Sequence, residues 1–192
     1  MKRSSGTRNM ERPAALSVSP GPTLPGLSYG GKIRANKEVR SVRRRVGMDI
    51  TWLTDRIAVG GGIWTAENMA AVSRAGITHI IDMQIEFDDT SLAEPHEIKV
   101  CWNPIDDDFE AKPAEVFARG VAFGLAALDG PQSKLFVHCA AGVHRAPMMA
   151  LALLGVLGWS LEDAMDLIET RRPAADFADV YVKSVERYLQ GL

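Results

Sequence analysis

The stretch of sequence that decides the fold is His138-Cys139-Ala140-Ala141-Gly142-Val143-His144-Arg145. Before it, residues 134–138 (Lys-Leu-Phe-Val-His) have the short, apolar pattern of a buried strand, and residues 145–157 after it form an apolar helical run. The expected order is therefore strand, tight loop, helix. The first backbone N–H groups of a helix have no partner within it, and the helix dipole is positive at that end. Such a loop predicts an anion site suited to phosphate.

The residue types in this loop indicate what the site does with the anion. Gly142 allows a positive φ angle, and Ala140 and Ala141 are small enough to leave the loop open. The guanidinium of Arg145 can bind two phosphate oxygens at once, which a lysine cannot do. The loop N–H groups and Arg145 should together favour the thiolate of Cys139. A thiolate beneath a bound phosphate is a nucleophile for phosphoryl transfer.

A run of three carboxylates supplies candidates for the acid that this chemistry needs. Asp106, Asp107 and Asp108 follow a predicted strand at residues 98–102. If the strands are parallel, the loops after both strands lie at one edge of the sheet, where ligands of open α/β sheets bind. A carboxylic acid there can protonate the leaving oxygen. The alternative is a solvated turn with no catalytic role.

Strand and helix signals alternate along the rest of the chain. The patterns predict strands at residues 56–60, 77–83, 98–102 and 134–138 and helices at residues 66–75, 113–128, 145–157, 160–171 and 177–189. Thr65 is a suitable N-cap for the first helix, and Ser160 with Asp163 resembles a capping box for the fourth. We therefore expect an α/β fold with a central, mostly parallel sheet flanked by helices on both faces.

The charge distribution divides the 192-residue chain in two. Residues 1–47 contain 11 Lys and Arg against 2 Asp and Glu, whereas residues 48–192 contain 11 against 22. Proline and glycine recur in the first part and apolar periodicity is absent, so we predict a disordered basic extension at 1–47 and a catalytic domain at 48–192. Met48 has the character of a natural start, which would make residues 1–47 an upstream extension. Arg43–Arg45 could contact nucleic acid or an acidic membrane, but a solvated tail is the preferred interpretation.

Cysteine content and hydropathy indicate the compartment. The chain has only Cys101 and Cys139, which is too few for a disulfide framework and suits a reducing cytoplasm. The N-terminus has no apolar segment of the kind found in secretory signals. The longest uncharged apolar stretch, residues 146–159, is shorter than the roughly 20 residues that span a bilayer. We expect a cytoplasmic protein without a membrane span.

The Cys-x5-Arg pattern after a histidine, with Gly142 three residues after Cys139, resembles the protein tyrosine phosphatase superfamily, and its spacing resembles the dual-specificity branch. The resemblance covers roughly residues 49–190 and includes similar stretches at 57–61, 75–82 and 171–173. It implies a dual-specificity-phosphatase-like fold and a reaction without metal or other cofactor. The family's acid typically lies about 30 residues before the cysteine, and Asp107 lies 32 before Cys139.

The resemblance assigns a role to each matching residue. Asp107 is the expected general acid, with Asp108 and then Asp106 as alternatives, and His138 is expected to support the loop by hydrogen bonds. The expected catalytic residues are Cys139, Arg145 and Asp107. The expected phosphate-binding residues are Cys139, Ala140, Ala141, Gly142, Val143, His144 and Arg145.

The implied function is phosphomonoester hydrolysis through a phosphocysteine, on phosphotyrosine and/or phosphoserine/threonine of proteins or on a small phosphomonoester. Val143 and His144 bring no fixed positive charge to the loop, which disfavours highly charged lipid headgroups. The family usually has Ser or Thr after the arginine, where this chain has Ala146, so we expect a slow second step. The alternative function is that of a pseudophosphatase, a module that binds phosphorylated partners without turnover.

Two further interpretations of the cysteines are open. His138, Cys139 and His144 could together ligate a metal, although no other ligands stand nearby at the usual spacing. Cys101 could form a disulfide with Cys139 under oxidation, although core packing is the preferred role for Cys101.

Overall fold

The structure is a computed structural model and describes residues 47–192. The predicted disordered basic extension at residues 1–47, apart from Gly47, lies outside the described residues, as do Arg43–Arg45. Within residues 47–192 no helix combines the length and the apolar character that crossing a bilayer requires.

A five-stranded sheet forms the centre of the described part, with strand order β1-β2-β5-β3-β4. The strands are β1 (Ile50–Trp52), β2 (Ile57–Gly60), β3 (His79–Asp82), β4 (Lys99–Trp102) and β5 (Leu135–His138). The last four are parallel to one another, and β1 pairs antiparallel with β2 at the edge. The prediction of a mostly parallel sheet is confirmed. The short edge strand β1 was not predicted from the sequence.

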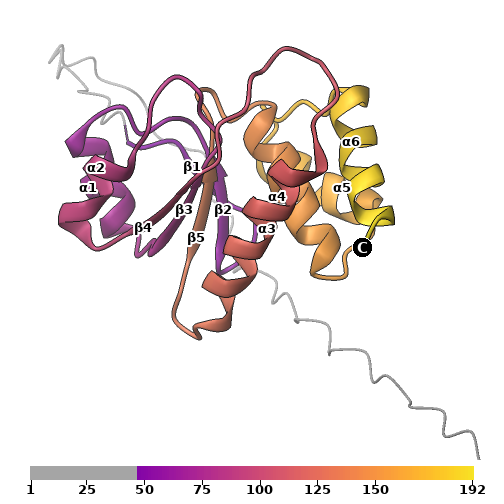
Figure 1. Ribbon diagram of the computed structural model, residues 1–192. Coiled ribbons are helices and arrows are strands. Elements are labelled where there is room, and N and C mark those ends of the chain that lie inside the picture. Colours follow the sequence, from indigo (N-terminus) through magenta and orange to yellow (C-terminus); the bar gives the residue numbers. More distant parts are fainter. Residues whose placement is uncertain (1–46) are drawn as a thin grey trace, which may run out of the picture. The chain divides into compact units, whose positions relative to one another are not determined.

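Helices cover both faces of this sheet, as expected from the alternating pattern (Figure 1). They are α1 (Ala66–Arg74), α2 (Thr90–Ala93), α3 (Ala114–Asp129), α4 (Arg145–Val156), α5 (Leu161–Arg171) and α6 (Asp179–Gln190), with a 3-10 turn at Glu94–His96. α1 and α2 lie on one face and α3 and α4 on the other, while α5 and α6 pack against α4. The predicted caps are present, because Thr65 accepts from the Asn68 N–H at 3.2 Å and Ser160 from the Asp163 N–H at 3.0 Å.

The central position of α4 places the loop that precedes it. All residues from 145 to 154 are buried, because α4 is enclosed by the sheet on one side and by α3, α5 and α6 on the others. Each large apolar side chain buried there contributes about 1.5–3 kcal/mol. The buried helix starts where β5 ends, and in the strand register His138 stands beside both Gly60 and Asp82. The ends of β2, β5 and β3 therefore meet at the N-terminus of α4.

Candidate active site

The loop between β5 and α4 folds tightly back on Cys139. The N–H of Gly142 points at the Cys139 sulfur, with 3.3 Å between N and Sγ. Gly142 has φ of +65°, and a Cβ at this position would lie 2.5 Å from the carbonyl oxygen of Gly60. Only glycine fits both constraints without displacing β2. The predicted need for a positive φ angle at this position is confirmed.

Several donors in this loop are left without a protein acceptor. In the part of the chain that the structure describes, five loop N–H groups make no hydrogen bond within the protein: those of Ala140, Ala141, Val143, His144 and Arg145. The Nε atom of Arg145 is buried and also has no partner. A buried donor without a partner, such as Arg145 Nε, is rare in proteins because it costs free energy. Together with the free N–H groups at the start of a helix, beside a buried cysteine, it indicates an oxyanion ligand.

The guanidinium of Arg145 is held by the segment after β3. Its Nη1 and Nη2 atoms lie 2.9 and 2.8 Å from the two carboxylate oxygens of Glu86, and Nη1 also donates to the carbonyl oxygen of Ile105 at 3.1 Å. The hydrogen bonds from Arg145 lower the pKa of Glu86. Glu86 therefore stays ionised and fixes the guanidinium in a plane that leaves Nε free.

One of the three predicted acid candidates lies beside this guanidinium. The Oδ2 atom of Asp107 is 3.7 Å from Arg145 Nε and 3.1 Å from His144 Nδ1. Its other oxygen, Oδ1, accepts a hydrogen bond from the hydroxyl of Tyr181 at 2.9 Å. The Asp107 carboxyl therefore contacts both helix α6 and the loop at residues 139–145, which we call the nucleophile loop after the expected role of Cys139.

The other two candidates lie in different surroundings. Asp108 forms an ion pair with Lys112, one turn further along the same segment. Asp106 is exposed, and its Oδ1 accepts the N–H of Asp107 at 2.8 Å. Neither forms an ion pair or a hydrogen bond with the 139–145 loop. Of the three candidates, Asp107 is thus the one with contacts to the 139–145 loop, and its role as the general acid stays a prediction.

Arg172 holds the nucleophile loop from the side opposite the donors. Its Nε donates to the carbonyl oxygen of Gly142 at 2.6 Å, and its Nη2 donates to that of Ala141 at 3.1 Å. The same guanidinium binds Asp49 at 2.6 and 2.8 Å, and these hydrogen bonds lower the pKa of Asp49. With the two carbonyl groups turned toward Arg172, the N–H groups on the other side of the peptides face inward.

His138 belongs to a buried polar group under the loop. Its Nε2 lies 2.7 Å from Asp89 Oδ2 and 3.7 Å from Asp82 Oδ1. Burial raises the pKa of Asp82 to about 6. The Asp82 carboxyl also accepts the N–H groups of Gln84 at 2.8 Å and of Asp89 at 3.3 Å, which shapes the turn that presents Glu86. The contacts of the His138 imidazole are therefore with the 82–89 turn, and not with the 139–145 loop that it was expected to support by hydrogen bonds.

The metal hypothesis drawn from the sequence does not match this geometry. His138 faces Asp89 and Asp82, while His144 lies between Asp107 and Asp176, so the two imidazoles and Cys139 do not converge. In residues 47–192 the one three-ligand group is Asp82, Asp89 and His138. Its shortest contact, 2.7 Å, is less than the spacing of about 3.3 Å between tetrahedral ligands bound roughly 2.0 Å from zinc.

The disulfide hypothesis is also wrong for this fold. Cys101 is on β4 and Cys139 follows β5, and β3 lies between these two strands. Two strand spacings separate their backbones by about 10 Å, beyond the roughly 7 Å limit for a disulfide. Both thiols are free.

A comparison with known families decides what kind of protein carries this loop. The family model "Dual specificity phosphatase, catalytic domain" matches residues 62–189. This range includes the nucleophile loop, Tyr181 and residues 103–113, the acid segment that carries Asp107. The chain belongs to the dual-specificity phosphatase family. The resemblance seen in the sequence is confirmed.

Two curated phosphatases that are similar to this chain are considerably longer than it is. The human protein phosphatase Slingshot homolog 2 is 26% identical over 135 residues, covering 69% of this chain and 9% of that protein. The phosphoglucan phosphatase DSP4, amyloplastic, of Castanea sativa is 22% identical over 209 residues, covering 96% of this chain and 56% of that protein. The chain thus spans about a tenth of the length of the first relative and little more than half of the length of the second.

Several solved structures share the fold of this chain. A PTPMT1 structure superposes with a TM-score of 0.65 at 17% identity, covering 74% of this chain and 94% of that one. The DUSP15 structure gives a TM-score of 0.63 at 23% identity, covering 74% and 88%. Tk-PTP in its active form gives 0.66 at 17% identity, covering 75% and 98%. These likenesses establish the dual-specificity phosphatase architecture of residues 47–192.

Three residues of this site were not found by reasoning from the sequence. Glu86 and Tyr181 had no local signal, because each acts on a partner about 60 or more residues away. Arg172 was noted only as part of a family-like stretch, without a role. The family resemblance could have drawn attention to Arg172, whereas Tyr181 needed the fold.

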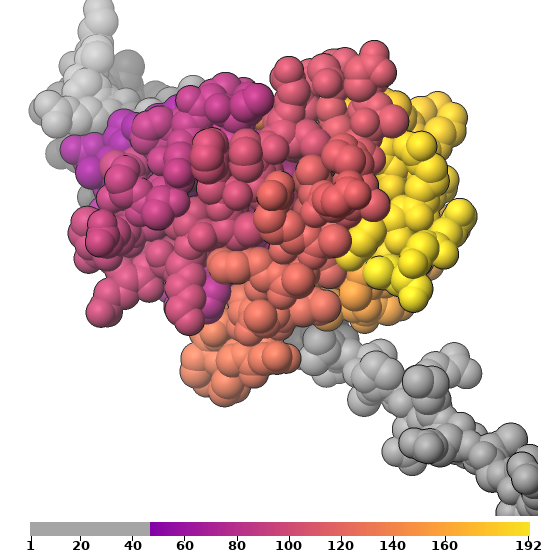
Figure 2. Space-filling view, in the orientation of Figure 1, coloured from indigo at the N-terminus to yellow at the C-terminus, as the bar shows by residue number. Residues whose placement is uncertain are grey.

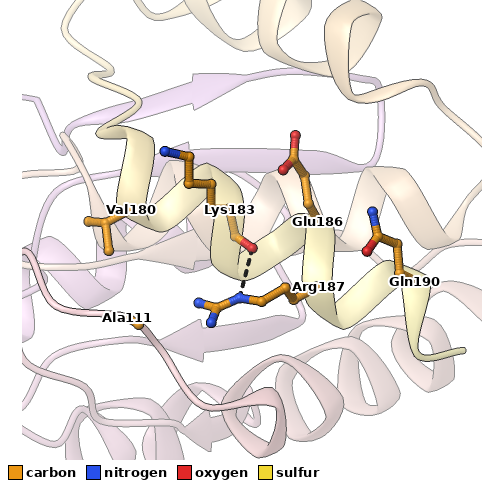
Figure 3. Close-up of a pocket in the computed structure, with 6 residues that line it drawn as sticks. All are labelled: Ala111, Val180, Lys183, Glu186, Arg187 and Gln190. Atoms are coloured by element: carbon orange, nitrogen blue, oxygen red, sulfur yellow. Dashed lines mark hydrogen bonds between the residues drawn. The ribbon is translucent and has the colours of Figure 1, made fainter.

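A separate hollow lies on the outer side of α6 (Figure 3). Its lining is Ala111, Val180, Lys183, Glu186, Arg187 and Gln190. The Nε of Arg187 donates to the carbonyl oxygen of Lys183 at 3.1 Å, so the charged groups are partly engaged with the helix itself. None of the nucleophile-loop residues lines this hollow, and it is distinct from the candidate site.

Proposed function

We propose that this dual-specificity phosphatase domain hydrolyses phosphomonoesters through a phosphocysteine, on phosphotyrosine and/or phosphoserine/threonine of proteins. One observation carries the proposal. The Cys139 sulfur lies at the base of a loop whose unpaired N–H groups and free Arg145 Nε match the oxygens of a phosphoryl group. The side chain of Asp107 stands over the same loop, 3.7 Å from Arg145.

In the first step the Cys139 thiolate attacks phosphorus and the P–O bond to the leaving group breaks. Asp107 gives its proton to that leaving oxygen, so the products are a phenol or alcohol, phosphocysteine and an ionised Asp107. The loop N–H groups and Arg145 stabilise the charge on the three equatorial oxygens. Arg145 is suited to this because its guanidinium is already fixed by Glu86.

In the second step water attacks the phosphocysteine and the S–P bond breaks. Asp107 accepts a proton from the water, which yields inorganic phosphate and restores the thiolate. Ala146, fully buried at the start of α4, has no hydroxyl to assist the departing sulfur. We expect this step to limit turnover.

The surroundings of the loop support a substrate with little negative charge beyond its phosphoryl group. Glu86, Asp107 and Asp176 all lie within hydrogen-bonding distance of Arg145 or His144 at the mouth. Their carboxylates would repel polyanions such as nucleic acid or inositol polyphosphates. Phosphorylated polypeptides and small phosphomonoesters carry less charge and are the substrates that we propose. Free thiols at Cys101 and Cys139 suit a location in the reducing cytoplasm.

The decisive experiment is hydrolysis of p-nitrophenyl phosphate in a buffer containing a chelator. We expect turnover in the wild type, none in Cys139→Ser, and retained vanadate binding in that variant. Asp107→Asn should lose roughly 10²–10⁴-fold in rate. Asp106→Asn and Asp108→Asn are matched controls, because they remove the same charge at neighbouring positions. A larger loss in either control would contradict the assignment of Asp107.

A panel of phosphorylated compounds then tests the substrate class. It contains phosphotyrosine and phosphoserine peptides, together with PI(5)P, with which PTPMT1 has been crystallised, and a phosphoglucan, named for DSP4. We expect preference for the peptides. Wild-type protein that binds vanadate but turns over no compound would instead indicate a phosphate-dependent binding module.

A further inference from the structure

The hydroxyl of Tyr181 lies at the junction of the acid segment and helix α6. Resting on the proposed phosphatase function, we propose that Tyr181 is a positioning residue for Asp107: it holds Oδ1, so that Oδ2 faces the leaving oxygen of the substrate. The proton then passes from Asp107 Oδ2 to that oxygen. The O–H bond on the carboxyl breaks, a new O–H bond forms on the leaving group, and the Tyr181 hydroxyl stabilises the carboxylate that remains.

The hydroxyl of Tyr181 both accepts and donates a hydrogen bond in this arrangement. It accepts the N–H of Phe109 at 2.9 Å and donates to Asp107 Oδ1 at 2.9 Å. Tyr181 is 1% exposed, and burial raises its pKa to about 12. The hydroxyl therefore keeps its proton throughout the working pH range and remains a donor.

The two oxygens of Asp107 are not equivalent as a result. Oδ1 is turned toward α6, whereas Oδ2 lies 3.1 Å from His144 Nδ1 and 3.7 Å from Arg145 Nε. Arg145 Nε is a donor without a protein partner, and it lies beside the loop N–H groups that would bind the phosphoryl oxygens. The oxygen beside it is the one that can reach the substrate, because Oδ1 already accepts the Tyr181 hydroxyl.

The acid segment has no helix or strand of its own, so contacts with α6 such as the Tyr181 hydrogen bond are needed to fix the position of Asp107. Residues 103–113 connect β4 to α3 and arch toward α6 (Figure 1), and their atoms pack against that helix (Figure 2). Phe109 has φ of +58° and stacks its ring on Tyr181 with 5.8 Å between centroids. The N–H of Lys112 donates to Ser184, one turn after Tyr181, at 3.0 Å. α6 itself packs on α3 and α4, so the hold is anchored in the core.

The test compares substrates whose leaving groups differ in their need for an acid. In Tyr181→Phe we expect kcat/KM for phenyl phosphate to fall roughly 10–100-fold, because misplacing a reacting group by about 1 Å costs up to 10²-fold. With 2,4-dinitrophenyl phosphate, whose leaving group needs no proton, we expect a change of less than about twofold. In an Asp107→Asn background Tyr181→Phe should cause no further loss, because both changes remove the same proton transfer.

Tyr188→Phe is the matched control. Tyr188 is also a buried tyrosine of α6, but it stacks on Phe117 and, unlike Tyr181, forms no hydrogen bond with residues 103–113. This variant should leave the leaving-group dependence unchanged. Equal losses of Tyr181→Phe on both substrates would show a merely structural role and overturn the proposal, as would losses that add fully to those of Asp107→Asn.

A second measurement does not depend on turnover. In crystal structures with vanadate bound to Cys139, we expect Asp107 Oδ2 to face the apical vanadate oxygen in the wild type and to lose that orientation in Tyr181→Phe. The same carboxyl orientation in both would overturn the inference about Tyr181. Failure of the proposed function would be distinct, since it would appear as a wild type that binds vanadate without hydrolysing any phosphomonoester.

Discussion

Arg145 and Glu86 form a two-point ion pair across the mouth of the nucleophile loop, with Nη1–Oε2 at 2.9 Å and Nη2–Oε1 at 2.8 Å. The two residues are 59 positions apart in the chain. The pair uses the outer nitrogen atoms of the guanidinium and leaves Nε, which is buried and unpartnered. A phosphoryl group can therefore be bound along the remaining edge without breaking the ion pair.

This relationship predicts the behaviour of Glu86→Gln. The variant keeps the shape of the side chain but loses the two-point carboxylate, so Arg145 is less well fixed. We expect kcat/KM for p-nitrophenyl phosphate to fall about tenfold, equivalent to roughly 1.4 kcal/mol. The free energy of unfolding should change by less than about 1 kcal/mol, since Glu86 is largely exposed. Glu169→Gln on the exposed face of α5 is the control; an unchanged kcat/KM in Glu86→Gln would show that Arg145 is fixed by other contacts.

Arg172→Lys should loosen the nucleophile loop, because Arg172 binds the loop carbonyl groups on the side opposite the N–H donors. A lysine keeps the charge but cannot bind Asp49 and the carbonyl groups of Ala141 and Gly142 at the same time. We expect kcat/KM to fall about 10²-fold through misplaced N–H donors. Unfolding free energy should fall by about 1–3 kcal/mol because buried acceptors lose their partner. Arg171→Lys, one residue earlier and exposed, should change neither quantity, and an equal effect of both variants would count against the loop-holding role.

Ala146→Ser tests the expected slow second step. Stopped-flow release of nitrophenol by the wild type should show a burst followed by a slower linear phase. A hydroxyl at position 146 should assist the departing sulfur, raising kcat several-fold and shrinking the burst while kcat/KM stays the same. Ala150→Ser places the same hydroxyl one buried turn further along α4 and should leave the burst intact. A linear trace in the wild type would refute the slow step.

The buried carboxyl of Asp82 should make stability depend on pH. Its pKa is raised from 3.8 to about 6 by burial, so the folded state binds this proton more tightly than the unfolded state. The contribution of Asp82 to the free energy of unfolding is therefore largest below about pH 4. It falls by on the order of 2–3 kcal/mol as the pH rises through about 6. Asp82→Asn should lack this loss, and urea unfolding from pH 4 to 7 measures the difference.

Asp49→Asn supplies the contrasting case for that experiment. Hydrogen bonds from Arg172 lower the pKa of Asp49, so its contribution is present above the unfolded-state pKa and is lost as the pH falls. This variant should be less stable than the wild type at pH 7 and approach it in acid. For the Asp82 prediction, free energies of unfolding that change in parallel with pH in the wild type and in Asp82→Asn would contradict the role of the buried Asp82 carboxyl.

Local patterns in the sequence were enough to predict strands β2 to β5 and helices α1 and α3 to α6, but not the short elements β1, α2 and the 3-10 turn at Glu94–His96. The order of strand 135–138, loop and helix 145–156 followed from short-range periodicity, and the positive φ of Gly142 followed from its place in the loop. Short-range signals are reliable here because the residues that impose them are neighbours. Edge strand β1 gave no such signal, since three residues are too few to show a period.

The side chains that hold Arg145, Asp107 and the backbone of the loop could not be predicted in the same way. Glu86, Arg172 and Tyr181 reach the loop only because β3, the end of α5 and α6 meet beside the N-terminus of α4. The preference for Asp107 over its two neighbours rested on spacing, whereas the contacts to Tyr181 and His144 depend on how residues 103–113 arch over the sheet edge.

For this protein, then, the sequence alone determined the α/β class, the family and the strand-loop-helix order around Cys139. The tertiary structure decided which carboxylates face that loop and which side chains hold them. The reason is physical: a helix start and a glycine turn are set by adjacent residues, but ion pairs such as Arg145–Glu86 and hydrogen bonds such as Tyr181–Asp107 form between segments that only packing of the core brings together.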